Sequence, residues 1–399
     1  MRLPKIGPGA VVTAALIWPG TVVVCLRAGV DFGYGLIWVL VVATLVAVVI
    51  QELAARLGVA GGLSLGEAIH RRFARRPWGR TLVAILVICG IGIGNAAYQA
   101  GNLLGAARGA QLLTGGSATV WMGVVALAAG TLLWIGRYRL LEGVLIAAVL
   151  VMALTFPVIA GLLVREPGAL VAGSLVPRLP DGAALTALAL AATMLVPYAL
   201  FVHALAARER WRGTAQLPQA RADLVITISL GGVIAIAIVV IGASQPGRSI
   251  ASPAALAILL DPQLGGWATS LFAVGLVAAG LTSAITAPLA AAYAVSGVLG
   301  WVQDLRSPLL RIVWVAVMMI GLGFAVAGVH PRAALSVAQA ANGILLPAAA
   351  VFLFVVANDR RLLKGASNGW VGNALGGAMV IATLVLGAAA LWGLMSAGR

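Results

Sequence analysis

Two prolines inside long apolar stretches mark the residues best placed to do chemistry in this chain. One lies in residues 17–21 (IWPGT), here called the first break, and the other in residues 195–199 (LVPYA), the second break. Proline lacks an N–H and clashes with the preceding turn, so each break opens a helix and frees backbone carbonyls and amides. Lipid cannot satisfy such groups, which therefore line a polar cavity where they can bind an ion or a solute.

The composition indicates what kind of protein must position these breaks. Of the 399 residues, 62% are hydrophobic and only 9% are charged, with 26 Lys and Arg against 11 Asp and Glu. Soluble domains carry about 25% charged residues, so a soluble enzyme, a nucleic-acid-binding domain and a disordered chain are all excluded. The repeated long apolar runs predict an all-α polytopic membrane protein instead.

Eleven segments are long and apolar enough to cross a membrane, which takes about 20 residues each. They lie near residues 8–28, 33–55, 81–113, 118–136, 140–164, 183–206, 222–243, 265–298, 308–329, 333–357 and 371–396. The breaks fall in the middle of the first and sixth spans. Because five is odd, a repeated five-span unit returns inverted, as in inverted-repeat transporters. We expect one transmembrane domain over residues 1–399, with repeats at about 8–164 and 183–357 and an extra helix at 371–396.

The formal net charge of +15 is explained by orientation in the membrane. Most of the Lys and Arg residues fall in loops on one side of the predicted bundle, including the run at 71–76. The positive-inside rule places this side in the cytoplasm, so the N-terminus is expected there and the C-terminus outside the cell (inner) membrane. Membrane lipid is therefore an expected partner and nucleic acid is not. Cys25 and Cys89 form no ligand pattern.

Several short motifs, taken in chain order, fit one known family. Residues 7–9 (GPG) open the first span, 51–58 (QELAARLG) end the second and 280–286 (GLTSAIT) form a polar patch in the eighth. Residues 336–347 have the spacing of a tenth span, with Gln339 in the place of a family glutamine, and NDRR follows as a turn. The chain resembles the NRAMP (natural resistance-associated macrophage protein) family of divalent-metal transporters. The resemblance implies a LeuT-type fold with a 5+5 inverted repeat, broken in helices 1 and 6.

The chain departs from the family at the positions that bind metal there. The family's first break reads Asp-Pro-Gly-Asn, and its Asp and Asn bind the metal, whereas this chain has Trp18 and Thr21. The second break usually reads Met-Pro-His-Asn with the Met sulfur on the metal, and this chain has Val196 at the Met position. A family alanine whose carbonyl binds metal matches Thr193. This member thus lacks the usual metal-binding Asp, Asn and Met.

The proton path of the family is altered as well. Its Asp and Glu in span three correspond here to Gln99 and Asn102, while the second family histidine of span six is retained as His203. Ionisable side chains inside a membrane are costly and usually functional, so His203 is a candidate for carrying a proton or gating a path. The alternative is a neutral histidine bonded to a neighbouring helix. Gln99 and Asn102 can equally serve as hydrogen bonds between helices.

The expected substrate site combines the two breaks with span ten. Its candidate residues are Trp18, Pro19, Gly20, Thr21, Thr193, Val196, Pro197, Tyr198 and Gln339. If a metal binds through side chains, its ligands are expected among Thr21, Thr193 and Gln339. The Trp18 ring can form a pocket wall or a cation–π surface, or it can simply fill the space of a lost metal site. The threonine and tyrosine hydroxyls can bind a substrate, or they can satisfy freed backbone groups.

These observations predict a secondary transporter that moves a divalent metal cation by alternating access around the two breaks. Two alternatives stay open at this point. One is a related carrier of hydrated Mg²⁺ or a small organic solute without proton coupling, and the other is a non-transporting sensor or partner subunit. An enzyme is not expected, because the spans show no nucleophile–base pair and no metal cluster. No cofactor is expected, and the sequence does not determine the oligomeric state.

Overall fold

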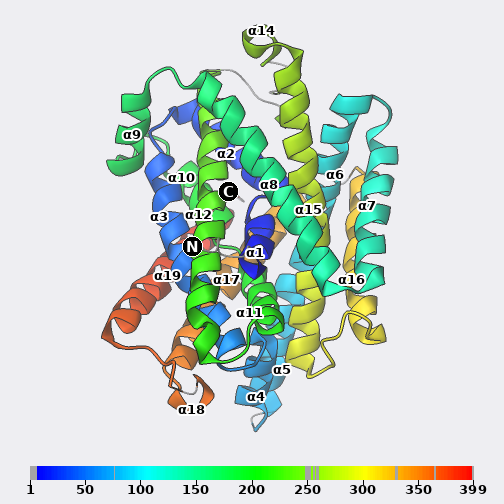
Figure 1. Cartoon of the computed structure of the whole chain (residues 1–399), viewed down its shortest axis with the longest axis vertical. Coiled ribbons are helices and arrows are strands. Elements are labelled where there is room, and N and C mark those ends of the chain that lie inside the picture. Colours follow the sequence, from blue (N-terminus) through cyan, green and yellow to red (C-terminus); the bar gives the residue numbers. More distant parts are fainter. Residues whose placement is uncertain are drawn as a thin grey trace.

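The computed structural model describes residues 7–75, 77–247, 253–254, 257, 260–328, 331–363 and 365–397, and within them every regular element is a helix (Figure 1). In chain order the elements are α1 (Pro8–Leu16), α2 (Pro19–Phe32), α3 (Ile37–Val59), α4 (Leu65–Phe73), α5 (Pro77–Val87), the π-helix η1 (Ile88–Ile93), α6 (Gly94–Thr114), α7 (Ala118–Ile135), α8 (Tyr138–Leu163), α9 (Pro167–Leu175), α10 (Ala184–Met194), α11 (Pro197–Arg210), the 3-10 turn η2 (Thr214–Gln216), α12 (Leu217–Ala243), α14 (Asp261–Leu264), α15 (Gly266–Leu299), α16 (Pro308–Val326), α17 (Pro331–Ala357), α18 (Arg360–Leu363) and α19 (Trp370–Ala397).

The predicted polytopic membrane architecture is confirmed. In the described part of the chain, nine helical segments are long and apolar enough to cross a membrane, and the bent pair α1–α2 makes a tenth. The tenth predicted span, 333–357, coincides with α17, in which the described residues Asn342–Ala357 form an apolar helix shorter than the other spans. The remaining predicted spans agree with the helices to within several residues. The chain is therefore a multi-pass membrane protein.

Helix α15 lies at the centre of the bundle and is buried along most of its length. Small residues let α6 approach it closely, as is usual between membrane helices. A Cβ added at Gly280 of α15 would lie 2.5 Å from the backbone nitrogen of Ala106, and one at Gly109 of α6 would lie 2.8 Å from the carbonyl oxygen of Ala273. Helix α15, together with α8, α11 and α12, packs around α1, and α6 contacts the start of α2 at Pro19, so the first break lies in the interior.

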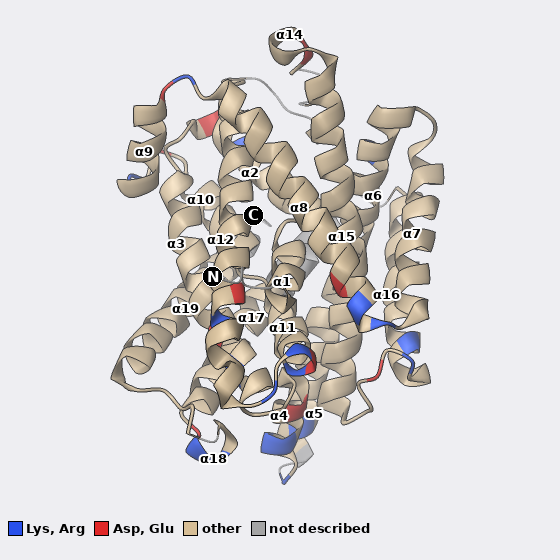
Figure 2. Cartoon of the chain, in the orientation of Figure 1, with Lys and Arg blue, Asp and Glu red and all other residues tan. Residues whose placement is uncertain are grey.

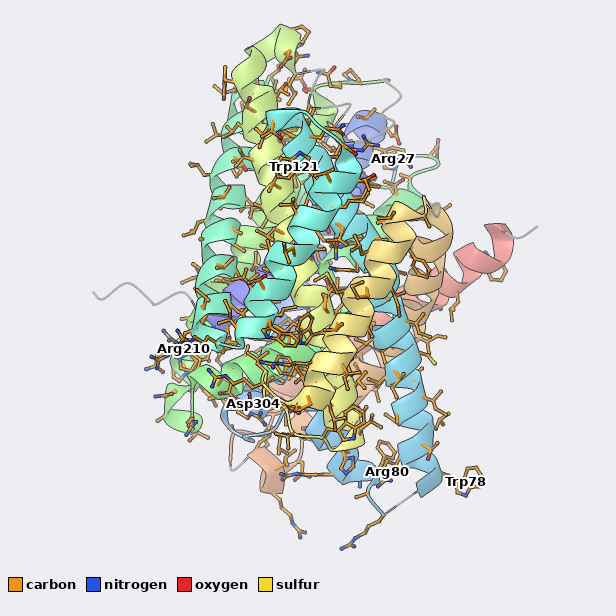
Figure 3. All side chains as sticks on the ribbon, turned by 90° about the vertical axis from the view of Figure 1, so that its right-hand side faces the viewer. Arg27, Trp78, Arg80, Trp121, Arg210 and Asp304 are labelled. Carbon is orange, nitrogen blue, oxygen red and sulfur yellow. The ribbon has the colours of Figure 1, made fainter. Side chains whose placement is uncertain are left out.

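Charged residues concentrate at the ends of the bundle, as the loop pattern predicts. Most of the described arginines lie in the lower part of Figure 2, around α4, α5, α11 and α18. In the side view of Figure 3, Arg80, Arg210 and Asp304 lie at this end, whereas Arg27 and Trp121 lie at the opposite end. The apolar middle between these ends matches the hydrocarbon core of a bilayer.

Candidate functional site

The first break is a short non-helical link between α1 and α2. Ile17 has a ψ of 81° and Trp18 a ψ of 166°, and the two helices meet at a bend of 57°. Pro19 begins α2, where its missing N–H costs nothing, and it forces the preceding Trp18 into an extended conformation. The Trp18 ring folds over Gly20, where an added Cβ would lie only 2.1 Å from the Trp18 Cη2 atom, so a larger residue here would displace the ring.

The backbone carbonyls that this break frees are satisfied by hydroxyl groups. The Leu16 oxygen accepts a hydrogen bond from Thr21 Oγ1 at 2.7 Å. The Ala15 oxygen accepts one from Tyr198 Oη at 3.0 Å, and the Ala14 oxygen accepts one from the Ser283 hydroxyl of α15 at 3.4 Å. Three successive carbonyls at the end of α1 thus have partners from three different helices.

The second break separates α10 from α11 at Leu195 and Val196, which are both non-helical. Pro197 begins α11 as Pro19 begins α2, so the two breaks share one cause. Thr193, in the last turn of α10, donates its hydroxyl to the Leu190 oxygen at 2.7 Å. The side chain of Val196 is buried. Because Tyr198 bonds to Ala15, the structure joins the two breaks directly.

The Trp18 ring closes one side of the first break. It packs edge-on against Tyr98 of α6, with ring centroids 4.8 Å apart and an interplanar angle of 71°. The Tyr98 hydroxyl in turn accepts a hydrogen bond of 2.6 Å from the Asn342 side chain of α17. Neither Tyr98 nor Asn342 was among the predicted site residues. An amphipathic tyrosine in the middle of an apolar span was the available signal for the first of them.

The amides at the family's proton-path positions bind to each other and to neighbouring helices. Gln99 Nε2 donates to the Ala284 oxygen of α15 at 3.1 Å and contacts the Met318 sulfur at 3.0 Å. Asn102 Nδ2 donates to Gln99 Oε1 at 3.3 Å. An amide side chain does not titrate, so this pair holds α6 against α15 and α16 and carries no proton.

His203 lies on α11 and is fully buried. Its Nδ1 is 3.0 Å from the side-chain oxygen of Gln51 on α3, and its Nε2 has no hydrogen-bond partner among the described residues. Since an amide oxygen only accepts, Nδ1 carries the proton and Nε2 presents a lone pair. His203 is therefore both bonded to a neighbouring helix and left with one free acceptor.

The two breaks contain no acidic side chain. For Gln339, the third part of the predicted site, the structure shows only the helix to which it belongs. Within the described ranges no group of three or more His, Cys, Asp or Glu residues could hold a metal ion. Gln339 belongs to α17, but its side chain lies outside the described part of the structure. The nearby buried carboxylate of Asp223 is engaged elsewhere, because it accepts hydrogen bonds of 2.7 and 2.8 Å from the amides of Gly7 and Gly9. It thereby caps the positive end of α1.

Another feature that sequence reasoning missed is the π-helical turn η1 in the first third of the third span. The alternating glycines of residues 90–94 were expected to permit close helix packing. Gly90 does face α17, where an added Cβ would lie 3.2 Å from Leu345 Cδ2. The same residues also widen the helix over Ile88–Ile93. Such π turns are often found at functional sites.

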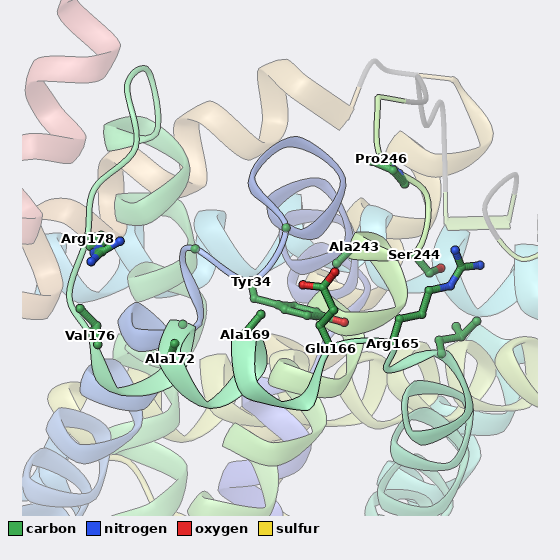
Figure 4. Close-up of a pocket in the computed structure, with 14 residues that line it drawn as sticks. Tyr34, Arg165, Glu166, Ala169, Ala172, Val176, Arg178, Ala243, Ser244 and Pro246 are labelled. Atoms are coloured by element: carbon green, nitrogen blue, oxygen red, sulfur yellow. The ribbon is translucent and has the colours of Figure 1, made fainter.

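A separate pocket of about 590 Å³ lies where the α2–α3 and α8–α9 connections meet the end of α12 (Figure 4). Figure 4 shows the Tyr34 ring beside the Glu166 carboxylate, with Arg165 and Arg178 farther out. Partial burial, together with the negative charge of Glu166, raises the pKa of Tyr34 above its ordinary value. None of the predicted site residues lines this pocket, so it is distinct from the breaks.

Comparison with known proteins agrees with this geometry. The family model described as "Natural resistance-associated macrophage protein-like" matches residues 9–393. The "Divalent metal cation transporter MntH" of Mycobacterium tuberculosis (strain H37Rv) is 31% identical over 391 residues, which cover 92% of this chain and 87% of that protein.

Two solved structures show the same fold at low sequence identity. A mutant of the Eremococcus coleocola manganese transporter has a TM-score of 0.82 and 21% identity, covering 99% of this chain and 87% of that one. MhsT in complex with L-phenylalanine has a TM-score of 0.65 and 13% identity, covering 98% and 99%. These neighbours are LeuT-fold transporters, as the paired breaks predict. From the family match and the mycobacterial relative together, the chain belongs to the NRAMP family.

Proposed function

We propose that this protein is a secondary transporter that moves a divalent metal cation across the membrane by alternating access, with its cargo site between the two breaks. The membrane would be the cell (inner) membrane, with the N-terminus in the cytoplasm and the C-terminus outside. The inverted repeats would span about 8–164 and 183–357, with 371–396 as the extra helix. The relatives are named as a divalent metal cation transporter and a manganese transporter, which supports both transport and a metal cation as cargo. Neither name is that of an enzyme.

The observation that carries this proposal is the direction of the hydrogen bonds at the breaks. Thr21, Thr193 and Tyr198 each donate their only hydroxyl proton to a backbone carbonyl. A hydroxyl has a single hydrogen atom. When that hydrogen is already bonded to a fixed acceptor, the hydroxyl presents only oxygen lone pairs to any other partner. The breaks are therefore lined by acceptors, which favours a cation and disfavours an anion.

The same observation indicates how the cation is held. With no carboxylate at the breaks, a fully dehydrated divalent ion would face a large desolvation cost. An ion that keeps part of its water shell avoids most of this cost, and its water molecules point hydrogen atoms outward. These hydrogens match the lone pairs of Thr21, Thr193 and Tyr198. We therefore expect the cargo to be partly hydrated and bound weakly, with half-saturation on the order of 1 mM, as in charge-poor extracellular calcium sites.

Trp18 and the coupling candidates take definite roles in this proposal. The Trp18 ring, packed on Tyr98 of α6, forms one wall of the first break. Gly20 and the two prolines shape the backbone, while Val196 supplies an apolar surface. Gln99 and Asn102 fix α6 in place, and His203 remains the single predicted coupling residue that can bind a proton. Gln339 is proposed as a further neutral ligand from α17.

Uptake into proteoliposomes tests the proposal. We expect saturable uptake of a divalent cation from a panel of Mg²⁺, Ca²⁺ and Mn²⁺, and no uptake of sulfate. Thr21→Val and Thr193→Val keep the side-chain shape but remove the oxygen, so each should raise the half-saturation concentration several-fold.

The matched control is Thr383→Val. Thr383 is buried in α19 and donates to the Val380 oxygen at 2.8 Å, which is the bond type that Thr193 makes, but it belongs to neither break. It should leave uptake unchanged. The absence of uptake for every cation, or equal effects of all three substitutions, would contradict the proposal.

A further inference from the structure

A groove runs along the outer surface of the bundle between α7 and α16. It has a volume of about 470 Å³ and is lined by residues that include Gly123, Leu127, Gly130, Trp314, Met319 and Leu322. The two helices lie next to each other on the face turned toward the viewer in Figure 3. Leu127 and Met319 are 72% and 58% exposed, so the groove opens toward the surrounding lipid.

Missing side chains on α7 create this groove. Gly123 and Gly130 stand two turns apart on the same face of α7, and an added Cβ at Gly123 would meet nothing within 4 Å. At Gly130 an added Cβ would lie 4.0 Å from Trp314 Cζ3, which is ordinary contact. At a rise of about 1.5 Å per residue, the lining from Ile135 to Gly123 spans roughly 18 Å. This length is close to half of the ~30 Å hydrocarbon core, the depth that one acyl chain fills.

One end of the groove carries polar groups whose hydrogen-bonding capacity is unused. Trp314 is only 4% exposed, yet its Nε1–H has no partner among the described residues, and the same holds for Nε of Arg311. Arg311 and Trp314 lie three residues apart and so face the same side of α16. Buried donors are nearly always paired in folded proteins, so this pair indicates an absent acceptor.

The same end is positively charged and aromatic. The Arg311 guanidinium lies 4.4 Å from the centroid of the Trp134 ring and donates to the Trp134 carbonyl at 2.9 Å. Trp134 and Trp314 pack edge-on at 6.3 Å. The stem of Arg306 packs against Gly136 at the end of α7, where an added Cβ would lie 3.1 Å from Arg306 Cγ.

The balance of charge at this end is basic. The connection after α7 adds Arg137 and Arg139, and the aspartate of the facing loop, Asp304, accepts from the Arg306 amide at 2.8 Å. Paired tryptophans and arginines are typical of the zone where phospholipid headgroups meet a membrane protein.

We propose that this groove binds one anionic phospholipid. One acyl chain fills the channel along Gly130 and Gly123, the phosphate lies at the guanidinium of Arg311, and Trp314 Nε1–H donates to an ester oxygen of the glycerol. Trp314 stands about 4.5 Å deeper than Arg311 along the helix axis, which is the order in which phosphate and ester groups follow each other. A free phosphate would leave the channel empty. This site does not depend on which cargo the breaks carry.

Native mass spectrometry of the full chain in detergent tests the proposal. Phosphatidylglycerol and phosphatidylcholine with identical acyl chains serve as probes, together with inorganic phosphate. We expect phosphatidylglycerol to be retained about tenfold more tightly than phosphatidylcholine, because both lipids carry the same phosphate but the choline cation is repelled by the arginines at this end of the groove. Inorganic phosphate should neither bind nor displace it.

Variants separate the parts of the proposed site. Gly130→Leu and, independently, Gly123→Leu fill the channel and should each abolish the retained lipid. Trp314→Phe keeps an aromatic, though smaller, ring, removes the N–H and should weaken retention of both lipids without abolishing it. The control is Gly161→Leu, an exposed glycine of α8 with nothing within 4 Å of an added Cβ, which should change nothing. Melting temperatures measured without added lipid show whether each variant is folded.

Three results would overturn the proposal. The first is equal retention of both lipids that neither glycine substitution on α7 alters. The second is displacement of phosphatidylglycerol by inorganic phosphate, which would identify a simple anion site. The third is a dimer that Gly130→Leu dissociates while lipid binding is unchanged, which would identify a second copy as the occupant.

Discussion

Replacing Trp18 with aspartate should turn the neutral first break into a site that binds divalent cations directly. In the present structure the Trp18 ring lies against Tyr98 and over Gly20, and no carboxylate belongs to either break. The matched control is Trp18→Asn, because asparagine has the same shape as aspartate and leaves the same space. Both variants lose the aromatic pair, worth about 1 kcal/mol, so the difference between them isolates the charge.

The size of the effect follows from electrostatics. At an effective dielectric constant near 20, unit charges about 4 Å apart attract by about 4 kcal/mol, and a divalent ion doubles this to about 8 kcal/mol. Taking the carboxylate out of water costs several kcal/mol, so roughly 2–3 kcal/mol should remain. This difference corresponds to about 30- to 150-fold tighter binding by Trp18→Asp than by Trp18→Asn.

Isothermal titration of both detergent-purified variants with Mn²⁺ measures this ratio. Thermal unfolding without metal shows whether both variants are folded before metal is added. Equal Mn²⁺ affinities for two folded variants would refute the reasoning, because they would show that residue 18 does not face the bound ion.

The remaining predictions concern the contacts that hold the breaks and the proton. Tyr198→Phe leaves the Ala15 carbonyl without its partner, so it should destabilise the protein by about 1–3 kcal/mol in denaturation experiments; an unchanged midpoint would contradict the bridge between the breaks. In Asp223→Asn, the side chain can accept a hydrogen bond from only one of the Gly7 and Gly9 amides and carries no charge. The start of α1 should therefore detach from α12 more often. The labelling rate of Ala10→Cys in a Cys89→Ser background should then rise about tenfold or more, and a constant rate would argue against this anchor. Wild-type proteoliposomes should take up micromolar Mn²⁺ poorly because the breaks carry no anion; strong uptake that is abolished by Thr21→Val or Gln339→Leu would count against the hydrated-ion account. His203→Ala should weaken any dependence of uptake on pH, and a variant with unchanged flux and pH profile would remove His203 as a proton carrier.

Much of the architecture could be predicted from the sequence because it depends on local properties. Apolar length alone locates the spans, and a proline inside such a span opens the helix wherever it occurs. Pro19 and Pro197 therefore predicted both breaks, and their separation by five spans indicated the inverted repeat. The class of membrane protein was predicted from the composition, and its orientation from the arginines on one side. Neither prediction depends on tertiary contacts.

The partners of the site residues could not be predicted, because they depend on how distant helices meet. Tyr198 bonds to a residue 183 positions away, and even the local bond of Thr21 to Leu16 depends on how the chain bends at the first break. The contact of Trp18 with Tyr98 likewise requires α6 to lie beside the first break. The π turn η1 arises from alternating glycines, which are compatible with an ordinary helix as well. The sequence therefore pointed to the hydroxyls, but only the fold shows which backbone carbonyls they donate to.

The position and hydration of a bound ion test the central claim most directly. A structure of the protein with Mn²⁺, recorded so that anomalous scattering locates the metal, would show where the ion lies. We predict a peak between the two breaks, with the oxygens of Thr21, Thr193 and Tyr198 about 4–5 Å from the metal, the separation expected through a bridging water. Direct contacts of about 2.1 Å, or a metal bound only outside the breaks, would contradict the account.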